Sequence, residues 1–227
     1  MRRDFVIERL EVDAPAELGK ALDDLARDAE NGDENAKAAL VAVVDAMNDP
    51  RARDSLQRLR EEAEGAELVT LARLLRRPVH PSVPPGSRSP RAPDYGYGRP
   101  LTLGERKSLA KKTDRHLLEK LLGDPHPDVI RFVLRNPRLT EDDVVRFVAR
   151  TPGRPELITE VARSPKWVHR PRVRLAIVLN PISPTELTTP MTALLLRHEL
   201  KLVVESTTVA PEVRAACLEH LARKHPP

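Results

Sequence analysis

Residues 127–144 read PDVIRFVLRNPRLTEDDV, and residues 171–188 read PRVRLAIVLNPISPTELT. The two stretches align without a gap, and the Asn-Pro steps at Asn136 and Asn180 coincide. Proline disfavours helix in the residue before it, so each Asn-Pro step predicts a helix end. Each stretch therefore predicts a helix, a tight turn and the start of a second helix.

Start signals for further helices surround this pair of stretches. Thr102 followed by Glu105, and Ser183 followed by Glu186, read as capping boxes. Thr140 precedes three carboxylates, which are favourable at a helix N-terminus. Residues 101–227 are therefore expected to form about eight short helices.

The self-similarity has an offset of 44 residues, a third copy of its opening lies 40 residues further on at Pro211, and a weaker copy lies at Pro155. A lone unit of two helices cannot cover its apolar face, so it stacks on the next. Residues 100–224 resemble HEAT-like α-solenoids, and more narrowly uncharacterised bacterial proteins with a Pro-x-Val…Leu-x-Asn-Pro repeat. The resemblance implies a HEAT/armadillo-like right-handed stack of short antiparallel helix pairs. It implies no activity, because solenoids host many functions.

Residues 1–76 are expected to form an α-helical N-terminal domain. A helix after Asp13 has apolar residues recurring at helical spacing, and residues 35–47 are apolar nearly all round. Further helices are expected from Pro50 and over residues 66–76. Residues 2–12 fit a short helix or a strand. The fold class is therefore all-α throughout.

Residues 77–100 predict a linker, because seven of these 24 positions are proline. It contains the Pro-x-x-Pro pattern twice, which suits a spacer or a polyproline ligand. Tyr95 and Tyr97 lie between the linker's glycines and prolines. They are expected to dock onto a neighbouring domain or to act as an exposed anchor for a partner.

Composition bounds the class of protein. Hydrophobic residues make up 40% of the 227 residues, which suffices for a core, and Cys217 is the one cysteine. No disulfide within the chain and no cysteine-based metal site can form. No signal-peptide pattern and no membrane-length apolar run occurs, so the cytoplasm is the expected location.

The sequence contains no known catalytic motif, so no catalytic residue, metal site or cofactor is predicted. The seven histidines show no metal-ligand spacing, and His126 and His169 suit turn or capping roles. The carboxylates after Thr140 are explained by the helix start. A DNA glycosylase of HEAT-like fold is the enzyme alternative, but it needs a carboxylate beside aromatic residues, and none can be placed beside Trp167.

Charge is uneven along the chain. Residues 1–77 carry a net charge of −5 and residues 78–227 carry +9, and residues 131–174 hold eleven Lys and Arg against five Asp and Glu. We name the following six residues the arginine strip: Arg131, Arg135, Arg146, Arg150, Arg170 and Arg174. The predicted function is a non-enzymatic protein-binding or scaffolding module that meets an acidic partner through this strip. Nucleic acid is the alternative partner, and a solvated face without function is the third interpretation. The sequence leaves the oligomeric state open.

Overall fold

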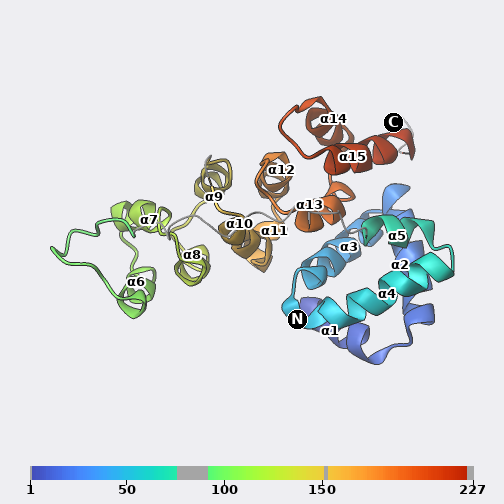
Figure 1. Ribbon diagram of the computed structural model, residues 1–227, viewed down its shortest axis with the longest axis horizontal. Coiled ribbons are helices and arrows are strands. Elements are labelled where there is room, and N and C mark those ends of the chain that lie inside the picture. Colours follow the sequence, from blue (N-terminus) through green and yellow to red (C-terminus); the bar gives the residue numbers. More distant parts are fainter. Residues whose placement is uncertain (1, 76–91, 151–152, 224–227) are drawn as a thin grey trace. The chain divides into compact units, whose positions relative to one another are not determined.

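Every regular element that the structure describes is helical. The computed structural model describes residues 2–75, 92–150 and 153–223. Within these ranges the chain forms fifteen α-helices and one 3-10 helix, and no strand (Figure 1). The all-α prediction is confirmed. Residues 77–91 of the expected linker, which contain both Pro-x-x-Pro patterns, lie outside the described residues.

Aspartate side chains cap two of the N-terminal helical elements. These helices are α1 (Arg2–Val12), α2 (Pro15–Glu30), α3 (Glu34–Met47), η1 (Pro50–Ala52), α4 (Arg53–Gly65) and α5 (Val69–Leu74). Asp33 caps α3 by accepting a hydrogen bond of 2.7 Å from the Ala36 N–H. Asp49 accepts from the Arg51 N–H at the start of η1. The four helices expected after Asp13 are confirmed, and the ambiguous residues 2–12 form a helix.

Contacts divide the chain into two compact units. Unit 1 holds residues 1–78 together with residues 178–227, and unit 2 holds residues 79–177. The expected repeat domain of residues 101–227 is thus divided within α12 (Pro171–Leu179). The domain boundaries drawn from the sequence stay a prediction.

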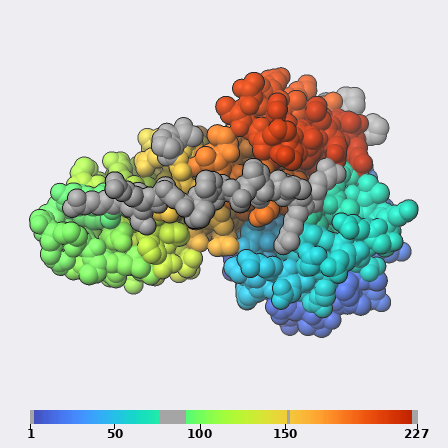
Figure 2. Space-filling view, in the orientation of Figure 1, coloured from blue at the N-terminus to red at the C-terminus, as the bar shows by residue number. Residues whose placement is uncertain are grey.

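In unit 1, the last three helices pack with the N-terminal ones. These helices are α13 (Thr185–Thr192), α14 (Arg197–Glu205) and α15 (Pro211–Arg223). α13 contacts both α5 and α15, and Leu71, Met191 and Val213 are almost fully buried. Asp23 of α2 is buried and accepts a hydrogen bond of 2.8 Å from the Leu71 N–H, which ties α2 to α5. On the face shown in Figure 2, the side chains of α4 and α5 form one continuous surface.

In unit 2, short helices alternate between two rows. They are α6 (Leu103–Leu109), α7 (Arg115–Leu121), α8 (Pro127–Leu134), α9 (Glu141–Val148), α10 (Pro155–Ala162), α11 (Pro165–Val168) and α12. α8 contacts both α6 and α10 in one row, and α7, α9 and α12 follow one another in the second row (Figure 1). Side chains join neighbouring helices across 28 to 30 positions, as in the hydrogen bonds of Arg115, Arg131 and Lys166. The step between adjacent helix pairs is therefore shorter than the expected 40 to 44 residues.

The caps expected in the second half are confirmed at two of three places. Thr102 and Glu105 form a capping box on α6, and Thr140 forms one with Asp143 on α9. The expected capping box at Ser183 is wrong. α13 begins only at Thr185, after Pro184, and the Ser183 hydroxyl is buried without a hydrogen-bond partner in the described part of the chain.

The two Asn-Pro steps form the same turn. The side-chain carbonyl of Asn136 accepts a hydrogen bond of 2.9 Å from the Arg138 N–H. That of Asn180 accepts one of 3.0 Å from the Ile182 N–H. Asparagine is suited to this turn because its side-chain carbonyl can take the place of a backbone carbonyl and accept a hydrogen bond from the N–H two residues later. The sequence match at these positions thus reflects a shared local geometry.

The two tyrosines of the expected linker differ in burial. Tyr95 is buried in unit 2, and its hydroxyl donates a hydrogen bond of 2.5 Å to the fully buried Asp124. Arg106 of α6 binds the same carboxylate at 2.7 Å. Burial, with help from the Asp124 carboxylate, raises the pKa of Tyr95. Tyr95 therefore docks its segment onto the turn between α7 and α8, which Arg106 joins to α6, whereas Tyr97 is exposed.

One backbone position carries strain that a mutation can relieve. Glu67 has a φ of 54°, a left-handed conformation that glycine adopts most easily. It follows α4, where the Leu68 N–H bonds the Ala63 carbonyl at 3.0 Å, a pattern that normally has glycine at this point.

Glu67→Gly is expected to raise the free energy of unfolding by about 0.5 to 1 kcal/mol, because glycine carries no left-handed penalty. Urea unfolding followed by circular dichroism measures this change. Ala66→Gly is the matched control: Ala66 has an ordinary φ of −97°, so glycine there should destabilise. A loss of stability in both variants would contradict the account of Glu67.

Candidate binding surface

The six residues of the arginine strip lie on or beside three helices of unit 2. Arg131 lies in α8 and Arg135 ends it, Arg146 lies in α9, and Arg174 lies in α12. Arg150 follows α9 and Arg170 precedes α12. Their surroundings decide which of them can meet a partner.

Arg131 joins two helices. Its Nε lies 2.7 Å from Glu160 Oε2 and a terminal nitrogen lies 3.0 Å from Oε1, so the pair is bidentate. Glu160 lies on α10 and is buried. The hydrogen bond to Glu160 raises the pKa of Arg131. Because the guanidinium compensates a buried carboxylate, we assign it a structural role.

Arg146 has a similar role beside Asp143. Asp143 is buried at the start of α9 and accepts two hydrogen bonds of 2.5 Å from Arg115 of α7. Arg146 adds a third, of 2.9 Å. The Arg115 hydrogen bonds hold the pKa of Asp143 far below its ordinary value, with help from Thr140 and against the effect of burial. Asp143 thereby joins α7 to α9.

Arg150, Arg170 and Arg174 differ in how accessible they are to a binding partner. Arg150 donates a hydrogen bond of 3.3 Å to the Leu122 carbonyl. Arg174 is buried and donates one of 3.1 Å to the Val168 carbonyl. Arg170 is exposed, at 3.9 Å from Glu141. Arg174 therefore does not belong to a solvent-facing row, because its guanidinium faces the interior of the fold.

A second group of basic residues makes no ion pair with any residue that the structure describes. We name this group the turn cluster: Lys111, Lys112, Arg135, Arg138 and Lys166. All five are exposed. They lie on the turn after α6, the turn after α8, and α11. Only Arg135 belongs also to the arginine strip.

Asn136 and Phe132 connect the parts of the turn cluster. The Asn136 side-chain amide donates hydrogen bonds of 2.8 Å to the carbonyls of Ala110 and Lys112. The Asn136 carbonyl accepts one of 3.4 Å from the Lys166 Nζ. Lys111 and Arg135 lie 5.7 and 5.9 Å from the Phe132 ring centre. One turn residue and one ring thus bring all three segments together.

The sequence reasoning missed Lys111 and Lys112, which lie outside the window of residues 131–174. One signal could have found them. Lys111 and Lys112 follow the C-terminus of α6, and Arg135 follows the C-terminus of α8. The equivalent helix ends of two adjacent helix pairs therefore both carry cations. His126 does cap α8 as expected, since its Nδ1 accepts a hydrogen bond of 3.2 Å from the Asp128 N–H.

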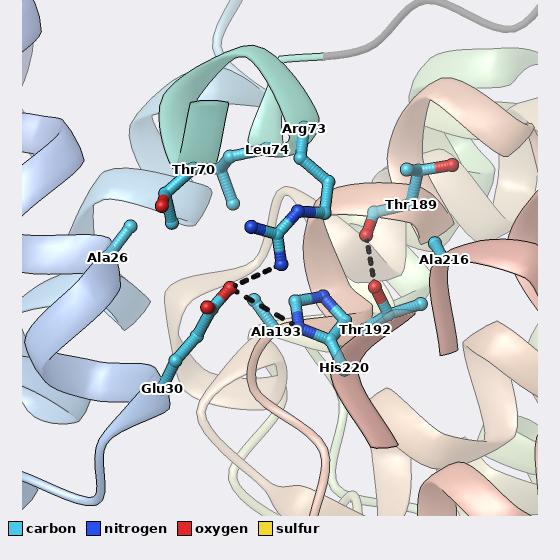
Figure 3. Close-up of a pocket in the computed structure, with 10 residues that line it drawn as sticks. All are labelled: Ala26, Glu30, Thr70, Arg73, Leu74, Thr189, Thr192, Ala193, Ala216 and His220. Carbon is cyan, nitrogen blue, oxygen red and sulfur yellow. Dashed lines mark hydrogen bonds and ion pairs between the residues drawn. The ribbon is translucent and has the colours of Figure 1, made fainter. Parts of the chain in front are cut away.

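A separate buried polar group lies in unit 1 (Figure 3). Glu30 of α2, Arg73 of α5 and His220 of α15 line a cavity of about 10 Å³, with Thr189 and Thr192 of α13. That volume holds about one water molecule. A substrate pocket measures roughly 300 to 1,000 Å³, so we assign the group to the core of unit 1.

Among the residues described, no cluster of three or more His, Cys, Asp or Glu side chains could hold a metal ion. No helix there is both long enough and apolar enough to cross a membrane. Comparison of the chain with protein-family models, with curated proteins and with solved structures finds no match.

Proposed function

We propose that the chain is a non-enzymatic binding module that captures an acidic segment of another protein through the turn cluster. The observation that carries the proposal is the contrast in charge pairing within unit 2. Arg115, Arg131 and Arg146 bind buried carboxylates. The five cations of the turn cluster bind none among the described residues, so their charge is available to a partner.

The alternating helix pairs of unit 2 fit this proposal. A HEAT-like solenoid presents the turns between its helices as one edge, and the turn cluster occupies such turns. A scaffold of this kind would act in the cytoplasm.

Two observations favour protein over nucleic acid. Trp167 is buried, and its indole N–H donates a hydrogen bond of 2.8 Å to the Leu134 carbonyl, so the ring is not a platform for stacking bases. Carboxylates also border the cluster, since Asp114 and Asp142 are exposed at the starts of α7 and α9. A long phosphate backbone that passes these carboxylates would be repelled, whereas a short acidic segment can bind the cluster without reaching them.

The test compares two charge-reversal variants of the full chain. The cluster variant carries Lys111→Glu, Arg135→Glu and Arg138→Glu. The control variant carries Lys20→Glu, Arg53→Glu and Lys201→Glu, three exposed residues of unit 1 that likewise make no ion pair with any described residue. Both variants change the net charge equally. Fluorescence anisotropy follows a labelled glutamate-rich peptide and a single-stranded DNA of equal charge, from about 50 to 200 mM salt.

We expect the peptide to bind the wild type and to bind the cluster variant about tenfold more weakly or worse, a loss of about 1.4 kcal/mol. The control variant should bind as the wild type does. Equal losses in both variants would show general charge attraction and contradict the proposal. DNA binding tighter than peptide binding throughout the salt range would favour the nucleic-acid alternative instead.

A further inference from the structure

The C-terminal end of α4 carries exposed acidic charge that the fold does not use. Residues 61–67 read EEAEGAE, and Glu61, Glu64 and Glu67 are exposed. None of these three carboxylates makes an ion pair with any residue that the structure describes. We name these three residues the acidic end.

The place of these carboxylates on the helix is unfavourable for folding. The C-terminus of a helix carries partial negative charge, so a carboxylate there destabilises the helix. Glu64 lies in the last turn of α4, and Glu67 follows the helix with its φ of 54°, which is strained for glutamate. Residues that break a local rule of folding without compensation within the fold point to a function at the surface.

Other acidic runs in the described chain are already paired. Asp23 and Asp24 of α2 both bind Arg27. At the start of α9, Asp142 lies 2.8 Å from Arg172, and Asp143 binds Arg115. The acidic end therefore differs from these runs, because its negative charge is available to a cation outside the molecule.

The turn cluster has the chemistry that the acidic end lacks. It presents five exposed cations that bind no described carboxylate, and the acidic end presents three exposed carboxylates that bind no described cation. Each surface also includes an apolar side chain. Val69 is 59% exposed just after the acidic end, and the half-buried Phe132 ring lies 5.7 Å from the Lys111 Nζ. Complementary charge around a small apolar contact is typical of protein interfaces.

We infer that the turn cluster of one copy of this chain binds the acidic end of a second copy. This inference rests on the proposed function, because it names the partner whose acidic segment the turn cluster captures. The two surfaces are different, so the contact is head-to-tail, and a bound pair still offers one turn cluster and one acidic end. The assembly therefore grows beyond a dimer unless it closes into a ring.

Sedimentation velocity of the full chain across a range of protein concentrations tests the inference. We expect the wild type to associate in about 50 mM salt and to dissociate towards about 200 mM, because salt screens exposed charges. The acidic-end variant carries Glu61→Lys, Glu64→Lys and Glu67→Lys. That variant and the cluster variant should each associate about tenfold more weakly or worse, because like charges then face one another. Lysine suits a helix C-terminus better than glutamate, so the acidic-end variant should stay folded.

Mixing the two variants separates a direct contact from a loss of folding. In the mixture, the glutamates introduced into the turn cluster of one variant meet the lysines introduced into the acidic end of the other. The unchanged surfaces of the two variants also remain complementary. Association should therefore return towards the wild-type strength, although neither variant associates alone. A mixture that stays monomeric would overturn the inference.

The control variant for the acidic end carries Glu8→Lys, Glu11→Lys and Glu17→Lys. These are exposed residues of unit 1 that make no ion pair with any described residue, and their replacement changes the net charge equally. The control should associate as the wild type does, and an equal loss in both variants would overturn the inference.

Peptide binding distinguishes this inference from the proposed function. A wild type that binds the glutamate-rich peptide but stays monomeric at every concentration would refute this inference alone. Association restored in the mixture, with no peptide binding by the wild type, would refute the capture of other acidic segments and leave the contact between copies.

Discussion

Glu30→Gln is expected to lower the free energy of unfolding by about 3 to 5 kcal/mol, the usual cost of removing one partner from a buried ion pair. Arg73 is 4% exposed and its terminal nitrogen lies 2.9 Å from Glu30 Oε1 (Figure 3). His220 Nδ1 lies 3.4 Å from the same oxygen, and Arg223 lies 3.9 Å from the other. Glutamine would leave the Arg73 charge without its nearest compensating anion.

The pH dependence of this contribution follows from the direction of the pKa shift. Burial alone would raise the pKa of Glu30, but the His220 hydrogen bond and the charges of Arg73 and Arg223 together hold it below its ordinary value. A carboxyl with a lowered folded-state pKa stabilises above its unfolded pKa and loses that effect as pH falls through the folded pKa. The difference between wild type and Glu30→Gln should therefore narrow in acid.

Urea unfolding of the full chain measures this prediction, and Glu219→Gln is the control. Glu219 lies 3.6 Å from Arg73 but its side chain is 38% exposed, so its loss should cost much less. Replacing Glu30 and Arg73 together by leucine should recover most of the loss, because no buried charge is left without compensation. Equal effects of Glu30→Gln and Glu219→Gln would refute the assignment.

Asp45→Asn is expected to stabilise the protein by about 2 kcal/mol at pH 8. Asp45 lies on α3, is 2% exposed, and its Oδ1 has no hydrogen-bond partner among the described residues. Burial raises the pKa of Asp45 to about 6, opposed by Arg3 and aided by Asp49. Forcing a proton off such a group costs at most about 3 kcal/mol at 1.36 kcal/mol per pKa unit.

The sign of this effect is opposite to that at Glu30. A carboxyl with a raised folded-state pKa contributes stability below its unfolded pKa of about 3.9, and that stability is lost as pH rises through about 6. The advantage of Asp45→Asn should therefore vanish near pH 4, where both side chains are neutral. Thermal or urea unfolding at several pH values between about 4 and 8 measures it.

Asp49→Asn is the matched control, four positions along the chain. The Arg51 hydrogen bond, against burial, lowers the pKa of Asp49, so removing its charge should destabilise at pH 8. Stabilisation by both variants would indicate relief of general negative charge rather than burial of Asp45.

Local signals predicted the helices well, because caps and proline steps act within a few residues. The Thr102 hydroxyl and the Asn136 side-chain carbonyl show this, since each accepts a hydrogen bond from a backbone N–H within three positions. Residues 2–12 were ambiguous because the face buried by Ile7 and Leu10 is defined only when α1 meets α3. The predicted capping box at Ser183 was wrong because α13 begins only after Pro184.

The binding surface was only partly predictable from the sequence. Arg131 and Lys166 look alike as basic residues, yet one binds Glu160 at 29 positions away and the other binds no carboxylate in the described part of the chain. Arg174 looked exposed and is buried. Such differences depend on contacts between helix pairs, which no local pattern encodes. To predict which basic side chains can bind a partner, one must know which of them already form ion pairs with carboxylates in the folded chain.

The make-up of unit 1 from residues 1–78 and 178–227 has a consequence for folding on the ribosome. Domains generally begin to fold from the N-terminal side during synthesis. Glu30 and Arg73 emerge early, whereas His220 and Arg223 emerge after about 150 more residues have been made. Unit 2 is one continuous stretch of chain, so it can fold before the C-terminal helices of unit 1 have been synthesised. Nascent chains should therefore expose the α2 and α5 surface longest, which makes it the natural place for a chaperone to bind.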